Sequence, residues 1–114
     1  PETGTENVRF AAGTSGTEIV STLPPGGSRR YVLGAQDRQF LYVRVAPQAG
    51  PLDYQIFDPD GSFLLDMIGS AQEYRGQLWQ TGDHVVEVIN RTGSNQTYNV
   101  IFGIESPDQQ TGTQ

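Results

Sequence analysis

Short runs of alternating apolar and polar residues, each closed by turn residues, divide this sequence along most of its length. The clearest run covers residues 40–45, where aliphatic residues alternate with two aromatic residues and an arginine. Successive side chains of a β-strand point to opposite faces of the sheet, so this period of two predicts a strand with one aliphatic face. An Asp-Pro-Asp-Gly segment at 58–61 separates two such runs. It predicts a tight turn, because proline presets one turn dihedral and glycine permits a positive φ.

Runs of this kind recur at the spacing typical of an all-β sandwich or barrel, with eight or nine strands. No stretch has helical periodicity over enough residues to predict a helix. The chain has 114 residues, which is room for one domain. We expect that domain at 8–105, between an extended N-terminal tail at 1–7 and a polar C-terminal tail at 106–114. The predicted strands are residues 8–10, 19–23, 30–33, 40–45, 52–57, 63–68, 74–79, 84–89 and 98–104.

Composition excludes several classes of function. The chain contains no cysteine and one histidine, which rules out disulfide scaffolds, thiol catalysis and multi-histidine metal sites. Its net charge of -6 argues against nucleic-acid binding, which needs clustered positive charge. No apolar run approaches the roughly twenty residues of a membrane span. Without a credible nucleophile, base and orienting group, we expect no enzymatic activity and no catalytic residues.

Several turn-and-strand motifs follow one another in a definite order, at residues 10–15, 23–28 with Tyr31, 52–54, 57–61, 76–78, 81–83 and 98–102. In this order they resemble the bacterial pre-peptidase C-terminal domain family. The match extends over roughly 8–105. It departs from the family at His84, where an aromatic residue is usual after the Gly-Asp turn.

This resemblance implies a single antiparallel, jelly-roll-like β-sandwich that acts as a non-catalytic binding or structural module. It also implies a secreted or cell-surface location. Some relatives bind calcium or extracellular polymers such as collagen. A related sandwich serves as a periplasmic inhibitor of animal-type lysozymes. The partner implied is therefore a protein or an extracellular polymer, and fold alone does not choose between them.

Four carboxylates lie around the 57–61 turn and are candidate calcium ligands. Calcium takes about six to eight oxygen ligands, which carboxylates and turn carbonyls supply. The turn alone also accounts for such residues, so calcium is the alternative interpretation. The EF-hand spacing is absent, and no other cofactor is expected. The four residues are Asp53, Asp58, Asp60 and Asp66.

Two further sets of residues are candidates for binding. Phe40, Tyr42 and Arg44 share one face of a predicted strand and, if exposed, would form a platform for a sugar ring or a protein. Trp79, just before a turn, is either an anchor at the rim of such a surface or a cap on the core. Ser70 begins a Ser-Ala-Gln-Glu-Tyr segment that ends at Tyr74.

The segment 70–74 resembles the Ser-Gly loop ending in tyrosine with which some lysozyme inhibitors plug the active-site cleft. Alanine replaces the glycine here. The resemblance makes inhibition of a lysozyme one functional hypothesis, which the acidic net charge favours if the partner is basic. Another hypothesis is a self-assembling extracellular filament, in which the N-terminal segment of one copy adds a strand to the sheet of another. Alternation within 84–89 places His84 on the inward face of its strand.

Overall fold

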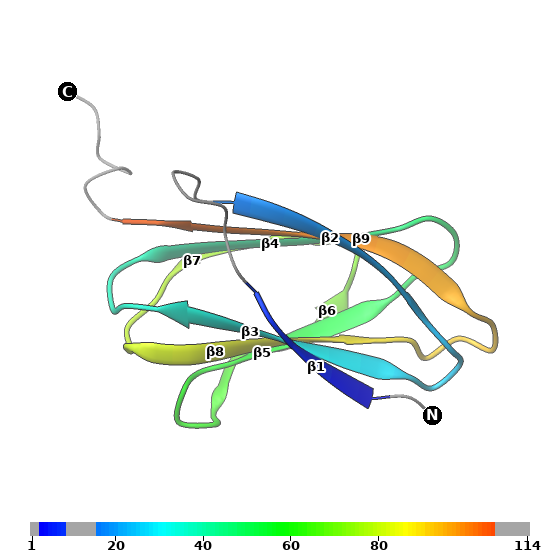
Figure 1. Ribbon diagram of the computed structural model, residues 1–114, viewed down its shortest axis with the longest axis horizontal. Helices are drawn as coiled ribbons and strands as arrows, with labels where there is room; N and C mark the ends of the chain where they lie inside the picture. The colour runs from blue at the N-terminus through cyan, green and yellow to red at the C-terminus, as the bar shows by residue number, and fades with distance from the viewer. Residues whose placement is uncertain (1–2, 9–15, 107–114) are drawn as a thin grey trace.

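The computed structural model describes residues 3–8 and 16–106, and in these ranges it contains nine strands and no helix that could cross a membrane. The strands follow the turn signals of the sequence and form two layers (Figure 1). They are β1 (Thr3–Asn7), β2 (Gly16–Leu23), β3 (Ser28–Ala35), β4 (Phe40–Pro47), β5 (Asp53–Phe57), β6 (Phe63–Gly69), β7 (Tyr74–Gln77), β8 (Gly82–Ile89) and β9 (Gln96–Glu105).

The two layers are a five-stranded and a four-stranded sheet. The first has the order β1-β3-β8-β5-β6 and the second the order β2-β9-β4-β7. All pairs except one are antiparallel. Strands far apart in sequence are therefore neighbours, as β2 and β9 are. This arrangement confirms the predicted all-β sandwich.

The core lies between the sheets, where the period of two in the sequence places one side of each strand. In β9 every second residue from Gln96 to Ile104 is buried, and in β4 the three aliphatic residues are buried while Arg44 is exposed. Burial of apolar area is the main favourable term in folding, so this alternation fixes the register of each strand. The largest fully buried side chains include Tyr31, Tyr54, Tyr98, Phe102, Leu33, Leu41, Leu52 and Ile56.

The N-terminal segment differs from the prediction. Residues 1–7 were expected to form a tail, but Thr3–Asn7 is the edge strand β1, which pairs in parallel with β3 of its own sheet. Arg29 of β3 donates a hydrogen bond to Glu6 at 2.8 Å across this pair. The strand is polar, and therefore the hydrophobic pattern does not reveal it. Among the described strands, β1 and β3 form the one parallel pair of an otherwise antiparallel sandwich.

The boundaries of other predicted strands and of the C-terminal tail also differ from the structure. Of the strand predicted at 8–10, Val8 lies beyond β1 and donates its backbone N–H to the Val32 carbonyl at 2.8 Å, while residues 9 and 10 lie outside the described ranges. Most of the expected C-terminal tail, 107–114, also lies outside them. β7 ends at Gln77, earlier than predicted, so Trp79 belongs to a loop.

Asn90 ties the end of β8 to the turn between β2 and β3. The side chain is fully buried, and its amide donates to the carbonyls of Leu23, Pro24 and Ser94 at 3.0, 3.1 and 2.8 Å. Its own carbonyl accepts hydrogen bonds from the backbone and hydroxyl of Thr92 at 2.9 and 2.7 Å. One asparagine therefore satisfies polar groups from two connections.

We expect the substitution Asn90→Ala to lower the free energy of unfolding by roughly 2 to 4 kcal/mol, because it removes a buried set of hydrogen bonds, three donated by the side-chain amide to backbone carbonyls and two accepted by its carbonyl from Thr92. Chemical denaturation measures this change. The matched control is Asn95→Ala in the same connection, where the side chain is exposed and the expected change is within about 0.5 kcal/mol. Equal effects of the two substitutions would contradict the role given to Asn90.

Candidate functional site

The outer face of the four-stranded sheet carries an ordered polar and aromatic cluster. The Tyr42 hydroxyl of β4 donates to Oε1 of Glu73 at 2.9 Å. The guanidinium of Arg75, on β7, lies 4.4 Å from the centre of the Tyr42 ring and donates from Nε to Oε2 of Glu73 at 3.4 Å. Tyr42 and Arg75 are direct cross-strand partners. We call Tyr42, Glu73 and Arg75 the tyrosine cluster.

The cluster keeps Glu73 ionised. The hydrogen bond from Tyr42 is the largest cause that lowers the pKa of Glu73, and Arg75 adds to it. The pKa of Tyr42 is raised, first by burial and then by its hydrogen bond to Glu73. The phenol is therefore a neutral donor and the carboxylate a charged acceptor. A surface tyrosine is thereby held in one orientation, as a binding contact requires.

Phe40 and Arg44 flank Tyr42 on the same side of β4, as the alternation predicted. Phe40 is partly buried and Arg44 is exposed. Two hollows border the cluster. One, of about 330 Å³, includes Phe40, Tyr42 and Arg75 in its lining, and the other, of about 530 Å³, includes Arg44, Ser70 and Glu73. The predicted platform thus forms part of an uneven surface with charged groups around its aromatic residues.

The segment 70–74 is held in place by contacts with the rest of the sandwich. The Ser70 hydroxyl accepts the backbone N–H of Leu52 at 3.1 Å, and the Ser70 N–H donates to the Leu52 carbonyl at 2.8 Å. Tyr74 is partly buried and packs against the core, opposite the buried Val43 of β4. Both residues therefore hold the loop in place. The exposed residues of the segment are Ala71, Gln72 and Glu73.

Sequence reasoning missed Glu73 and Arg75. A strand was predicted at 74–79, but Arg75 was not singled out, because nothing in the sequence showed that this strand pairs with β4. Glu73 is 31 residues from its partner Tyr42. The sequence does show a charged residue on each side of Tyr74, namely Glu73 and Arg75. This pattern could have indicated that both side chains lie on the solvent-exposed face of the short strand.

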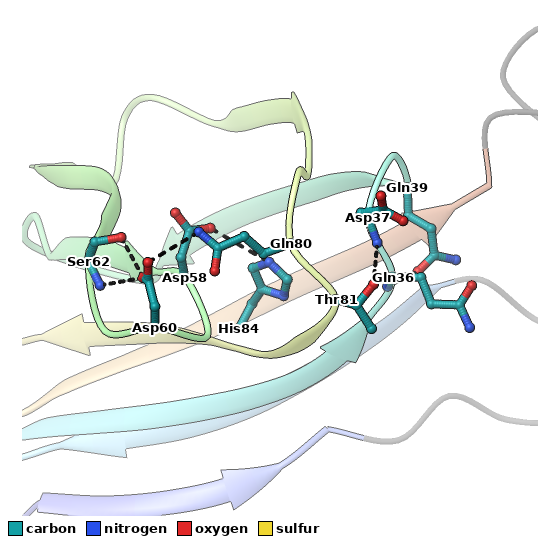
Figure 2. A network of polar contacts seen from close by, with 9 residues as sticks. All are labelled: Gln36, Asp37, Gln39, Asp58, Asp60, Ser62, Gln80, Thr81 and His84. Atoms are coloured by element: carbon teal, nitrogen blue, oxygen red, sulfur yellow. Dashed lines mark hydrogen bonds and ion pairs between the residues drawn. The ribbon is translucent and has the colours of Figure 1, made fainter.

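The loops β3–β4, β5–β6 and β7–β8 come close together at one end of the sandwich (Figure 2). Asp60 accepts hydrogen bonds from the backbone and hydroxyl of Ser62 at 2.9 and 2.6 Å, as a turn aspartate does, and from Gln80 at 3.4 Å. The Thr81 hydroxyl accepts the backbone N–H of Asp37 at 3.0 Å. The hydrogen bonds to Ser62 are the largest cause that lowers the pKa of Asp60.

The four aspartates of the calcium hypothesis do not form one cluster. Asp58 lies 3.7 Å from the buried His84, and Asp53 lies 3.8 Å from Arg91. Asp66 is exposed on β6. Within residues 3–8 and 16–106 there is no group of three or more acidic, histidine or cysteine side chains that could hold a metal ion. Calcium binding stays a prediction.

Trp79 is 66% exposed in the connection between β7 and β8. The preceding residue, Leu78, is fully buried and donates its backbone N–H to the Gln39 carbonyl at 2.7 Å. Of the two interpretations of Trp79, exposure therefore favours the rim anchor over the cap on the core. Among the described residues it is the most exposed of the large hydrophobic side chains.

No protein-family model matches this chain, and no curated protein matches it either. Solved structures do match. The periplasmic g-type lysozyme inhibitor PliG of Aeromonas hydrophila superposes with a TM-score of 0.81 at 16% identity, covering 91% of this chain and 98% of that one. PliG of Salmonella Typhimurium has a TM-score of 0.69 at 19% identity, with coverage of 89% and 97%. The pre-peptidase C-terminal domain of a Bacillus anthracis collagenase gives 0.61 at 12%, with coverage of 89% and 96%.

These likenesses concern the fold. Each superposition covers almost the full length of this chain and of the matched protein. The predicted architecture is therefore shared with lysozyme inhibitors and with a pre-peptidase C-terminal domain. At this level of identity, residue roles do not transfer between chains.

His84 gives this fold a measurable pH dependence. It has no exposed surface, and neither ring nitrogen has a hydrogen-bond partner among the described residues. Burial is the largest cause and lowers its pKa, while the backbone of Gly82 and the charges of Asp58 and Asp83 act in the opposite direction. The unfolded chain therefore binds a proton more readily than the folded one. The contribution of His84 to the free energy of unfolding is therefore fully present above the ordinary histidine pKa of about 6.5. It is lost as the pH drops below that value.

We expect His84 alone to lower the free energy of unfolding by about 1 kcal/mol for each pH unit below the ordinary histidine pKa. Denaturation between pH 7 and 5 should show a shallower dependence in His84→Leu than in the wild type. The difference between the two profiles isolates the histidine from other titrating groups. Parallel profiles would show that His84 does not titrate differently on unfolding.

Proposed function

We propose that this chain is a non-catalytic binding module that recognises a protein partner through the outer face of its four-stranded sheet. The observation that carries the proposal is the tyrosine cluster, in which Tyr42 is held by Glu73 and covered by Arg75. Tyrosine and arginine are enriched among the residues that dominate binding energy at protein interfaces. A cluster ordered in advance on a sheet loses little conformational entropy when it binds.

The position of the histidine supports a non-catalytic role. His84 is the one histidine of the chain and lies in the core, where it cannot exchange protons with a bound substrate. The Ser70 hydroxyl is engaged with the Leu52 backbone. Neither residue is in a position to act as a base or nucleophile at the surface.

The partner we propose is a lysozyme of the g-type, encountered in the periplasm or outside the cell. Support comes from the fold shared with two periplasmic inhibitors of that enzyme class along nearly the whole chain. The net charge of -6 would speed association with a basic enzyme by long-range attraction. The contacts of Ser70 and Tyr74 favour Tyr42, and not Tyr74, as the tyrosine that meets the partner.

Two other hypotheses remain as outcomes of the test. An extracellular polymer would be the ligand if the chain behaves like the collagenase domain whose fold it shares. The self-assembling filament needs a free N-terminal strand, and β1 is already paired with β3 of its own chain. The filament hypothesis therefore finds no support in these contacts.

The test is calorimetric titration of the chain into a g-type lysozyme, together with an assay of cell-wall hydrolysis. We expect binding with loss of lysozyme activity, and a weakening of about tenfold to a hundredfold in Tyr42→Ala. The substitution should leave folding intact, because the Tyr42 side chain lies outside the core.

Phe63→Ala is the matched control, since it removes an exposed aromatic side chain from the other sheet. It should leave the affinity unchanged. Absence of lysozyme binding, combined with retention on collagen or polysaccharide, would replace the proposed partner by a polymer. Equal losses in the two variants would contradict the assigned surface.

A further inference from the structure

Half of strand β4 has a neighbouring strand on one side only. The ladder with β7 ends where Val43 pairs with Tyr74, whereas the ladder with β9 continues to Pro47. Residues 44–47 of β4 therefore form a free edge within the four-stranded sheet. The hollow of about 530 Å³ lies along this edge, and we call it the strand slot. It is lined by residues 44–47 of β4 and by Ser70, Ala71 and Glu73 of the β6–β7 connection.

Two hydrogen bonds show which backbone groups of β4 face the slot. Gln48 donates its N–H to the Thr97 carbonyl at 2.9 Å, on the side of β9. Leu78 donates to the Gln39 carbonyl at 2.7 Å, on the side of β7. The backbone groups of successive residues in a strand point to opposite sides. Those of the even-numbered residues of β4 therefore face β9, and those of the odd-numbered residues face β7 or, beyond its end, the slot.

Val45 and Pro47 are the odd-numbered residues of the free edge. The N–H and C=O of Val45 and the C=O of Pro47 face the slot, and within the described ranges no group pairs with them. Val45 is 2% exposed, and its side chain belongs to the core. Buried backbone groups are almost always hydrogen-bonded. An unpaired donor and two unpaired acceptors beside a hollow therefore indicate a binding site for another piece of backbone.

The β6–β7 connection does not provide these hydrogen bonds, because its own groups are engaged elsewhere. Ser70 exchanges two hydrogen bonds with Leu52, at 2.8 and 3.1 Å. The Gln72 N–H donates to the Gly69 carbonyl at 3.1 Å, and the Gln72 carbonyl accepts the Tyr54 hydroxyl at 2.6 Å. The strand slot is therefore open to a segment of another molecule.

We propose that an extended segment of the protein partner enters the strand slot and adds to β4 as an antiparallel strand. In this arrangement one residue of the segment pairs with both the N–H and the C=O of Val45, and a second residue donates to the Pro47 carbonyl. Strand addition of this kind gives affinity through main-chain hydrogen bonds. The inference rests on the proposed function, because Glu73 of the tyrosine cluster also lines the slot.

The form of the free edge selects this occupant. β7 occupies the rest of the same side of β4, so the slot admits a short extended segment and not a long strand of a second copy. Pro47 has no N–H, and pairing therefore ends there. Arg44 is exposed at the edge and forms no ion pair with the other described residues. Its guanidinium is available to a carboxylate or carbonyl of the entering segment.

The experiment follows the Val45 amide and closes the slot. In the free protein we expect the Val45 N–H to exchange with solvent about tenfold faster than those of Arg44 and Ala46, which face β9. Ala71→Leu fills the slot from the β6–β7 connection. The matched control is Ala49→Leu, which enlarges another exposed alanine outside the slot. Thermal unfolding verifies that both variants are folded.

Each protein is titrated with the blocked peptide acetyl-Thr-Val-Thr-Val-amide, and its affinity for the g-type lysozyme is measured separately. We expect the peptide to shift the Val45 amide resonance in the wild type and in Ala49→Leu, but not in Ala71→Leu. The same peptide with an N-methylated backbone, which cannot donate, should shift it in none of them. Affinity for lysozyme should fall about tenfold or more in Ala71→Leu and should be unchanged in Ala49→Leu. The Val45 amide should become protected in the complex.

The two arms separate the slot from the proposed function. If the wild type binds no lysozyme but the peptide shifts Val45, the proposed partner fails and the slot stands. If lysozyme binds Ala71→Leu as tightly as the wild type and Val45 stays unprotected, the slot is overturned and the function stands. If Val45 exchanges as slowly as Arg44 in the free protein, the chain or a second copy already covers the edge, and the proposal is wrong. The absence of a response in both arms overturns both.

Discussion

One buried hydrogen bond between two tyrosines joins the sheets of this sandwich. The hydroxyl groups of Tyr31 on β3 and Tyr98 on β9 lie 2.7 Å apart in the core, and the Tyr31 ring is 5.3 Å from that of Phe102. Burial is the largest cause that raises the pKa of both phenols, so both stay neutral and can share a proton in a hydrogen bond. A single phenol left without its partner would be costly. The pair therefore adds one specific contact between the sheets to the apolar packing of the core.

The binding surface depends on that packing. Because Tyr98 of β9 lies in the core, the alternate residues Ile101 and Gly103 must face outward, and β4 follows through its register with β9. Tyr42 then lies between Gly103 on one side and Arg75 on the other. The core determines where the tyrosine cluster lies, and the cluster itself contributes little to the core. This division lets a stable fold carry a surface adapted to a partner.

Much of the fold was predictable from periodicity, but the contacts between distant strands were not. Alternation in 40–45 correctly placed Phe40, Tyr42 and Arg44 on one face, and alternation in 84–89 correctly placed His84 inside. β1 was missed because its pairing depends on backbone hydrogen bonds and not on apolar residues. The contact of Glu73 with Tyr42 depends on which strands are neighbours, and a single sequence does not contain that information.

The central claim is that a protein partner contacts the outer face of the four-stranded sheet, and hydrogen exchange of the complex with a g-type lysozyme tests it most directly. Amides slow their exchange where a partner covers them or stabilises the local structure. The account predicts added protection in β4, β7 and β9, around Tyr42, Arg75 and Gly103. Protection confined to β5, β6 and β8, or the absence of any complex, would contradict it.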